Sequence, residues 1–187
     1  VRSHQKALLP VLFRAAFEAL AALSADPKHL GAEVGALAVL HTWTRTLEWH
    51  PHVHLLVPGG GLAPDGRTWV PARRLRHGTL FLVPVKAVAK RFRGRFLHLA
   101  RRALPGIVLP DIPWGKKWVV FAKPTVQGAE AVLAYLGRYV HKTAITDRAL
   151  VGLREDTVSF GYRDSRDHRR KTMTLPAHEF LRRFLQH

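Results

Sequence analysis

The sequence predicts an α+β fold in which a central, mainly antiparallel sheet is flanked by helices. Three observations indicate this class. Hydrophobic residues make up 47% of the 187 residues. The mean hydropathy is near zero (−0.06), as expected of one compact domain over residues 1–187. Segments with helical spacing alternate with short apolar runs, in the order helix, two strands, helix, strand, helix, strands.

Hydrophobic spacing predicts the first three elements. Residues 10–25 have apolar side chains at helical spacing, with Pro10 suited to a first turn and Asp26-Pro27 ending the pattern. Residues 35–40 form a short apolar run, which is typical of a strand covered on both faces. Residues 52–58 alternate and predict a second strand. One face of that strand carries His52, His54 and Leu56, and the other carries Val53, Leu55 and Val57.

Glycine-rich segments follow the second strand. Gly59-Gly60-Gly61 and Pro64-Asp65-Gly66 predict tight turns before a short strand at Trp69-Val70. A glycine-rich loop can cradle a phosphate, but no Gly-Lys-Ser/Thr follows this one. We therefore expect no nucleotide cofactor.

The second half of the chain continues the alternation of helices and strands. Residues 84–103 predict an amphipathic helix, and a proline-rich loop follows it. Residues 128–141 predict another helix, with Val132, Leu133, Leu136 and Val140 facing inward. The remaining predicted elements are strands at 117–122, 151–153, 157–162 and 172–175, and a final helix at 177–185.

A strong positive charge predicts an anionic partner. Lysine and arginine number 30 against 13 acidic residues, which gives a net charge of +17. Nucleic acid is favoured over an anionic membrane, because no amphipathic membrane segment or lipidation motif is present; a merely solvated basic surface is the alternative. On the helix predicted at 84–103, Lys90, Arg91 and Arg95 are candidate contacts to a phosphate backbone.

Several sequence features restrict the compartment and the type of metal site. The chain has no cysteine, so any metal held by these residues must use nitrogen and oxygen ligands. No apolar run approaches the roughly 20 residues of a membrane span, and the first residues do not form a signal peptide. We expect a cytoplasmic, nucleoid-associated protein. The missing initiator methionine and the abrupt end at His187 suggest a fragment of a longer polypeptide.

A pair of histidines on one strand face is the first candidate site. His52 and His54 are two residues apart, so both imidazoles can reach one divalent cation, Mg²⁺ or Mn²⁺. Two imidazoles are an incomplete ligand set, and the candidates for the third ligand are His41, Glu48 and His50, with His41 and Glu48 ranked equally. A His-x-His pair on a solvated strand face is the simpler alternative.

Two tyrosines on one helix face are the second candidate site. Tyr135 and Tyr139 are four residues apart, so their phenols lie on the same side of the predicted helix. Either could attack phosphorus and store the bond energy as a phosphotyrosine, with Arg138 and Lys142 nearby to favour the phenolate. Core packing or base stacking is the alternative for each tyrosine taken alone.

The order and spacing of these motifs resemble a known family. The matching segments are Leu40 to Trp43, His50 to His54 continuing into Val57 to Leu62, Tyr135 to His141, and Lys171 to Leu175. They resemble the HUH-endonuclease transposases with two tyrosines, the rolling-circle insertion-sequence type, which are distantly related to Helitron and plasmid-replication initiators. The resemblance implies a Rep-like or RRM-like sheet core, with His52 and His54 as metal ligands and Tyr135 and Tyr139 as successive nucleophiles on single-stranded DNA.

The combined prediction is a transposase catalytic domain that nicks and rejoins single-stranded DNA at element ends and targets through a 5′-phosphotyrosine. The resemblance further implies an N-terminal cysteine-rich region and a C-terminal portion outside these residues. Two alternatives stay open. One is a noncatalytic nucleic-acid-binding module or inactive remnant, in which aromatic residues stack on bases. The other is a metal-dependent hydrolase that uses water, with structural tyrosines.

Overall fold

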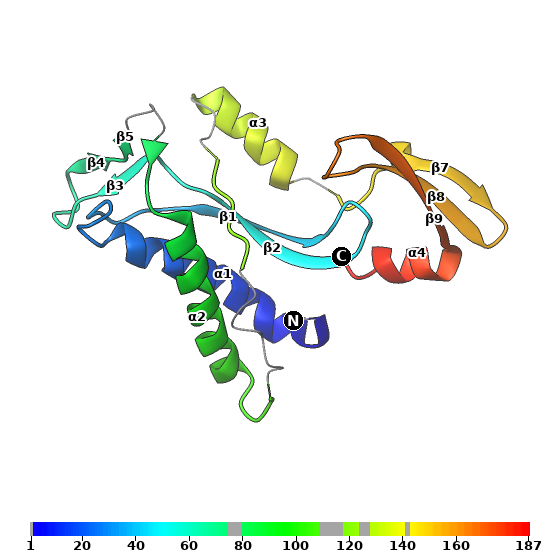
Figure 1. Ribbon diagram of the computed structural model, residues 1–187, viewed down its shortest axis with the longest axis horizontal. Coiled ribbons are helices and arrows are strands. Elements are labelled where there is room, and N and C mark those ends of the chain that lie inside the picture. The colour runs from blue at the N-terminus through cyan, green and yellow to red at the C-terminus, as the bar shows by residue number, and fades with distance from the viewer. Residues whose placement is uncertain (1, 75–79, 109–117, 124–127, 141–142) are drawn as a thin grey trace. The chain divides into compact units, whose positions relative to one another are not determined.

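The α+β class is confirmed in the computed structural model (Figure 1), whose described strands form small antiparallel sheets. The structure describes residues 2–74, 80–108, 118–123, 128–140 and 143–187. The chain divides into two compact units, each built from separate stretches of sequence. Unit 1 comprises residues 1–39 and 53–127, and unit 2 comprises residues 40–52 and 128–187. A single catalytic domain over residues 1–187 stays a prediction.

Two long helices are the main packing elements of unit 1. Helix α1 is Gln5–Ser24 and helix α2 is Val85–Ala103. Helix α1 begins five residues before the predicted start, so Pro10 lies inside the helix and not in its first turn. The reason is packing, since Leu8 is only 3% exposed and holds the additional N-terminal turn against the protein. Burial of that turn outweighs the backbone hydrogen bond that proline cannot donate.

An ion pair joins the two helices. Glu18 of α1 accepts hydrogen bonds from Arg95 of α2 and from Arg14, one helical turn earlier in α1. These two guanidinium groups lower the pKa of Glu18 from its ordinary 4.5 to about 2. Because the pKa is lower in the folded state, the carboxylate stabilises the fold fully above pH 4.5. That contribution is lost as the pH falls from 4.5 towards 2.

We expect Glu18→Gln to lower stability by about 1 kcal/mol or less at neutral pH, because the pair is partly solvated. The substitution should also flatten the dependence of the melting temperature on pH between 4.5 and 2. Thermal unfolding across that pH range measures both effects. Glu155→Gln, at an exposed turn residue of unit 2, makes the same charge change and should leave the slope unaltered. An unchanged slope in Glu18→Gln would show that the ion pair carries no stability.

The glycine-rich segment after the second strand was predicted to turn, but it forms a strand. Strand β3 (Gly60–Leu62) pairs antiparallel with β4 (Trp69–Pro71). A Cβ at Gly60 would lie 2.5 Å from the Val70 carbonyl oxygen, and a Cβ at Gly61 would clash with the Glu33 carbonyl. Two hydrogen bonds between Glu33 and Leu62 hold that close approach. The glycines therefore allow backbones to pack tightly.

Unit 2 contains a three-stranded antiparallel sheet covered by a helix. Strands β7 (Leu150–Arg154), β8 (Thr157–Arg163) and β9 (Arg170–Pro176) are ordered along the sheet as in the sequence, and helix α4 (Ala177–Phe184) follows. Phe160 of β8 is 1% exposed, and its ring centroid lies 5.8 Å from that of Phe180 of α4. All four predicted elements of this region are confirmed, each within a few residues of its predicted bounds.

Two sequence predictions about local structure were wrong. Residues 118–122 of the strand predicted at 117–122 form no strand, and residue 117 lies outside the described residues. Trp118 instead packs on Phe92 and Phe96 of α2, with ring centroids 4.9 and 5.3 Å away. Contacts between aromatic side chains, and not backbone hydrogen bonds to a neighbouring strand, therefore position Trp118. In helix α3 (Ala129–Val140), Leu133 is 66% exposed, although it was predicted to face inward. Val132 and Leu136 are half-buried, as predicted, and the side chain of Val140 lies outside the described residues.

The expectation that no segment approaches a membrane span also needs correction. By length and composition alone, Arg2–Ser24 is long and apolar enough to cross one. One such helix is weak evidence for a membrane location, because the core helix of a soluble protein and a signal sequence near the N-terminus pass the same test, and 44% of its most apolar window is buried inside the structure. A further short strand pair, β5 (Arg73–Arg74) with β6 (Leu80–Phe81), was not predicted.

Candidate metal centre

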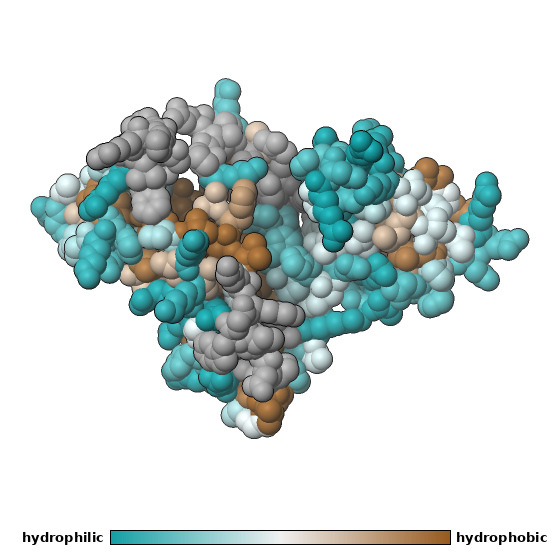
Figure 2. Space-filling model, in the orientation of Figure 1, coloured by the Kyte–Doolittle hydropathy of each residue, from teal (hydrophilic) through white to brown (hydrophobic). Residues whose placement is uncertain are grey.

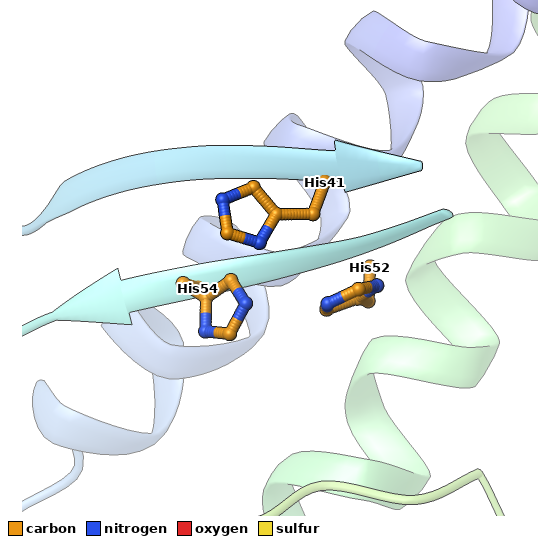
Figure 3. A group of neighbouring side chains, drawn as sticks. All are labelled: His41, His52 and His54. Carbon is orange, nitrogen blue, oxygen red and sulfur yellow. The ribbon is translucent and has the colours of Figure 1, made fainter. Parts of the chain in front are cut away.

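The two predicted histidine ligands lie on a β-hairpin. Strand β1 is Leu37–Trp43 and strand β2 is Trp49–Leu56, and the two pair in antiparallel directions (Figure 3). Leu55 and Val57 pack against the hydrophobic core of unit 1. Because side chains alternate along a strand, His52 and His54 lie on the other face of β2, as the sequence predicted.

Three histidines converge on this hairpin. His41 of β1 lies beside His52 and His54 of β2, and one ring nitrogen of each lies within 4.8 Å of the others (Figure 3). His41 is 4% exposed, whereas His52 and His54 are half-buried. Nitrogens at this separation can bind a single cation after small side-chain adjustments, so the donor set fits a metal ion.

A hydrogen bond fixes the protonation of one imidazole. Nδ1 of His52 lies 2.7 Å from the carbonyl oxygen of His50. A carbonyl oxygen only accepts, so Nδ1 carries the proton and donates it. The lone pair of the neutral ring is then on Nε2. This arrangement, with one nitrogen donating to a backbone carbonyl and the lone pair on the other, is typical of metal-binding histidines.

The structure separates the two equally ranked candidates for the third ligand. His41 belongs to the group of converging nitrogens, and Glu48 does not. The Glu48 side chain is 62% exposed, and a carboxylate oxygen lies 3.8 Å from Nη1 of Arg183 in α4. Glu48 therefore lies at the turn of the hairpin, where it makes a loose surface ion pair.

A row of aromatic side chains that were not predicted as site residues begins at His41. The Trp43 ring stacks on His41, with ring centroids 4.8 Å apart and planes 23° apart. His187 packs between Trp43 and Trp49, at ring distances of 5.7 and 6.0 Å. Nε2 of His187 donates to the Leu47 carbonyl at 3.2 Å, and its Nδ1 lies 3.0 Å from Oγ1 of Thr42. Trp43 could have been found from the sequence, because it is two residues from His41 on one strand face.

We expect Trp43→Ala to lower the affinity for Mn²⁺ by about tenfold, because the indole limits the orientation of the His41 ring. Trp43→Phe should retain most of the affinity, since a phenyl ring can still stack. Isothermal titration with MnCl₂ measures both changes. Trp69→Ala, at a half-exposed tryptophan of β4 outside the hairpin, is the control. Equal affinities in Trp43→Ala and the unaltered protein would exclude a positioning role for Trp43.

The predicted nucleophiles lie on α3, as expected. Tyr135 and Tyr139 are both within this helix, whose backbone is described, but their side chains and that of Arg138 lie outside the described residues. Lys142 also lies outside them. Gly137, between the tyrosines, is exposed, and a Cβ there would meet nothing within 4 Å. The convergence of the phenols with the histidines therefore stays a prediction.

The predicted DNA contacts on α2 differ from one another in their surroundings. Lys90 and Arg91 are exposed, whereas Arg95 is half-buried and paired with Glu18 of α1. The Glu18 carboxylate raises the pKa of Arg95 above its ordinary value. This guanidinium is therefore held by the fold, and Lys90 and Arg91 are the more accessible cations.

Known proteins resemble the chain over most of its length. Residues 35–187 match the model of the Y2_Tnp family, described as a putative transposase. The putative transposase y4qJ of Sinorhizobium fredii is 42% identical over 95% of this chain and 48% of its own length. The transposase for insertion sequence element IS801 of Pseudomonas savastanoi pv. phaseolicola is 30% identical over 96% of this chain and 45% of its own length. The chain thus spans about half the length of these relatives. No solved structure matches it.

Proposed function

Because this chain belongs to the Y2_Tnp family of putative transposases, we propose that it is the catalytic part of a transposase that nicks and rejoins single-stranded DNA. The convergence of His41, His52 and His54 on one hairpin is the observation that supports this most strongly. A family of DNA-mobilising proteins needs a centre that activates a phosphodiester, and this triad is the group of the described residues best suited to that role.

The proposed ligands are His41, His52 and His54, with water and phosphate oxygens in the remaining positions. A bound divalent ion would supply positive charge at the non-bridging oxygens of the scissile phosphate. An all-nitrogen protein set favours Mn²⁺ over Mg²⁺, because Mg²⁺ prefers oxygen ligands. The hydrogen bond from His52 to the His50 carbonyl would hold its ring in the coordinating tautomer.

The tyrosines of α3 are the proposed nucleophiles. The Oη of Tyr135 or Tyr139 attacks phosphorus, the bond from phosphorus to O3′ breaks, and the phenolic proton passes to solvent. O3′ takes up a proton and leaves as a free 3′-hydroxyl, while the 5′-phosphate stays on the tyrosine. Attack by a 3′-hydroxyl reverses the step and rejoins a strand without a nucleotide cofactor. A second tyrosine would allow a second strand to be held in the same way.

The proposed substrate is single-stranded DNA at element ends and at the target, which fits a chain of net charge +17. We place the protein in the cytoplasm with the nucleoid, where that substrate occurs. Since the chain spans about half of its relatives, whole-element transposition is proposed for the longer polypeptide and strand cleavage for this portion.

The test is formation of a covalent adduct. A 5′-labelled and a 3′-labelled oligonucleotide carrying an element end are each incubated with the protein and Mn²⁺, and the products are separated under denaturing conditions. We expect label on the protein only from the 3′-labelled strand, because the 5′-phosphate stays attached to tyrosine. EDTA should prevent the adduct. Protein labelled from the 5′-labelled strand would reverse the proposed polarity, and tight binding without any adduct would favour the noncatalytic binding module.

A further inference from the structure

One face of helix α2 combines exposed positive charge with an absence of acidic residues. Helix α2 contains neither aspartate nor glutamate. In Figure 2, hydrophilic residues lie over the part of this helix that the grey atoms leave in view. Its opposite side is buried through Phe96, Leu97, Leu99 and Ala100. The exposed side chains therefore form a continuous strip, here called the α2 face. Its members are Lys86, Lys90, Arg91, Gly94, His98, Arg101 and Arg102.

The charges of the α2 face make no ion pair within the part of the chain that the structure describes, apart from the paired Arg95 beside them. Arg95, one of two half-buried arginines of this helix, is paired with Glu18. Among the described residues, no salt bridge involves Lys86, Lys90, Arg91, Arg101 or Arg102. An uncompensated row of cations on one helix face is favourable when a polyanion lies against it.

A glycine lies at the centre of the α2 face. Gly94 is surrounded on the exposed side by Lys90, Arg91 and His98, at helical spacings of four, three and four residues. Glycine is the least favourable residue in a helix interior apart from proline. Among the residues that the structure describes, none requires glycine there, since a Cβ at Gly94 would meet no atom within 4 Å and its φ is not left-handed. The missing side chain leaves room for another molecule to approach the helix backbone.

We propose that the α2 face binds the phosphate backbone of duplex DNA, with one sugar-phosphate strand approaching the helix backbone at Gly94. The face carries cations and no phenylalanine, tyrosine or tryptophan, since Phe92 packs against Phe96 and Trp118. Single strands are bound mainly by stacking of bases on aromatic rings, whereas duplex backbones require positive charge and close approach. This surface is distinct from the histidine centre, and it rests on the proposed function only for the choice of DNA as the polyanion.

The length of the α2 face fits a short duplex segment. Lys86 and Arg102 are 16 positions apart, so the face spans about 24 Å at about 1.5 Å per helical residue. That length corresponds to about seven base pairs at about 3.4 Å each. Since only phosphates are contacted, the binding should not depend on base sequence.

The first test is Gly94→Ala, for which stability and affinity should change in opposite directions. The melting temperature should rise by about 2–4 °C, because alanine is the better helix former. Affinity for a 20-base-pair duplex, measured by fluorescence anisotropy in EDTA, should fall by about tenfold, the effect of losing one hydrogen bond to a charged group. Gly35→Ala adds the same methyl at another exposed, open glycine outside α2 and should leave duplex affinity unaltered.

The second test uses the salt dependence of duplex binding. Lys90→Ala and Arg91→Ala should each lower the slope of log K against log salt by about 1, equally for unrelated sequences. Unaltered slopes and affinities in these variants and in Gly94→Ala would overturn the proposal. Equal losses for single-stranded DNA of the same length would also overturn it, since the surface would then not select duplex. Because binding is measured in EDTA, these outcomes are independent of adduct formation at the histidine centre.

Discussion

His52→Ala is expected to lower the rate of metal-dependent strand cleavage at least about a hundredfold, because it removes a proposed ligand and the charge that the ion places on the phosphate. His54→Ala should have an effect of the same size. Both side chains are half-buried at the strand surface, so the fold should tolerate alanine and the melting temperature should change little. Rates are measured under single-turnover conditions with a labelled oligonucleotide and Mn²⁺.

The hairpin offers a matched control for these variants. The His50 side chain is exposed, its ring centroid lies 5.3 Å from that of His52, and its backbone carbonyl accepts from Nδ1 of His52. His50→Ala keeps that carbonyl, so cleavage should remain within about threefold of the unaltered rate. Glu48→Ala should behave like His50→Ala, because its carboxylate lies outside the histidine group. A large loss in Glu48→Ala with full activity in His54→Ala would show that the ligand set is wrong.

Replacing both tyrosines of α3 should abolish the covalent adduct while leaving DNA affinity unaltered. Phenylalanine keeps the ring of Tyr135 or Tyr139 and removes only the attacking oxygen. We expect the double variant to form no adduct above background, a loss of at least about 10³ in rate by analogy with removal of other enzyme nucleophiles. Each single variant should reveal which tyrosine attacks a given strand. Tyr162→Phe in β8 removes the third tyrosine of the chain and serves as the control.

The double variant also separates the remaining alternatives. If strands are still cut but no protein is labelled, the centre activates water and the tyrosines are structural. If neither the double variant nor the unaltered protein cuts any strand with any divalent metal, the chain is a binding module. Each outcome would leave the histidine cluster in place while changing the reaction assigned to it.

The spacing of hydrophobic residues was sufficient to predict which face of a single strand or helix is buried. Alternation in residues 52–58 correctly predicted that Leu55 and Val57 face a hydrophobic core and that His54 faces the other way. The helical spacing of α2 similarly predicted its buried and basic sides. These predictions succeed because the direction of a side chain within one helix or strand depends only on local geometry.

Contacts between elements could not be predicted in the same way. The choice between His41 and Glu48 depends on the pairing register of β1 and β2, and a slip of one residue would turn every side chain to the other face. The contacts of His187 with Thr42 and Leu47 join residues about 140 positions apart, with no sequence signal. Strand β3 was missed because the glycines that predict turns also permit the close approach of Gly61 to Glu33.

The most direct measurement of the central claim is mass spectrometry of the trapped adduct after digestion with trypsin. Cleavage after Arg138 separates the two candidate tyrosines, so that Tyr135 falls in residues 118–138, Tyr139 in residues 139–142 and Tyr162 in residues 155–163. We predict a 5′-phosphonucleotide on Tyr135 or Tyr139, formed with Mn²⁺ and absent with EDTA or in His52→Ala. A nucleotide on Tyr162 or on any other residue, or an equal adduct without metal, would contradict the account.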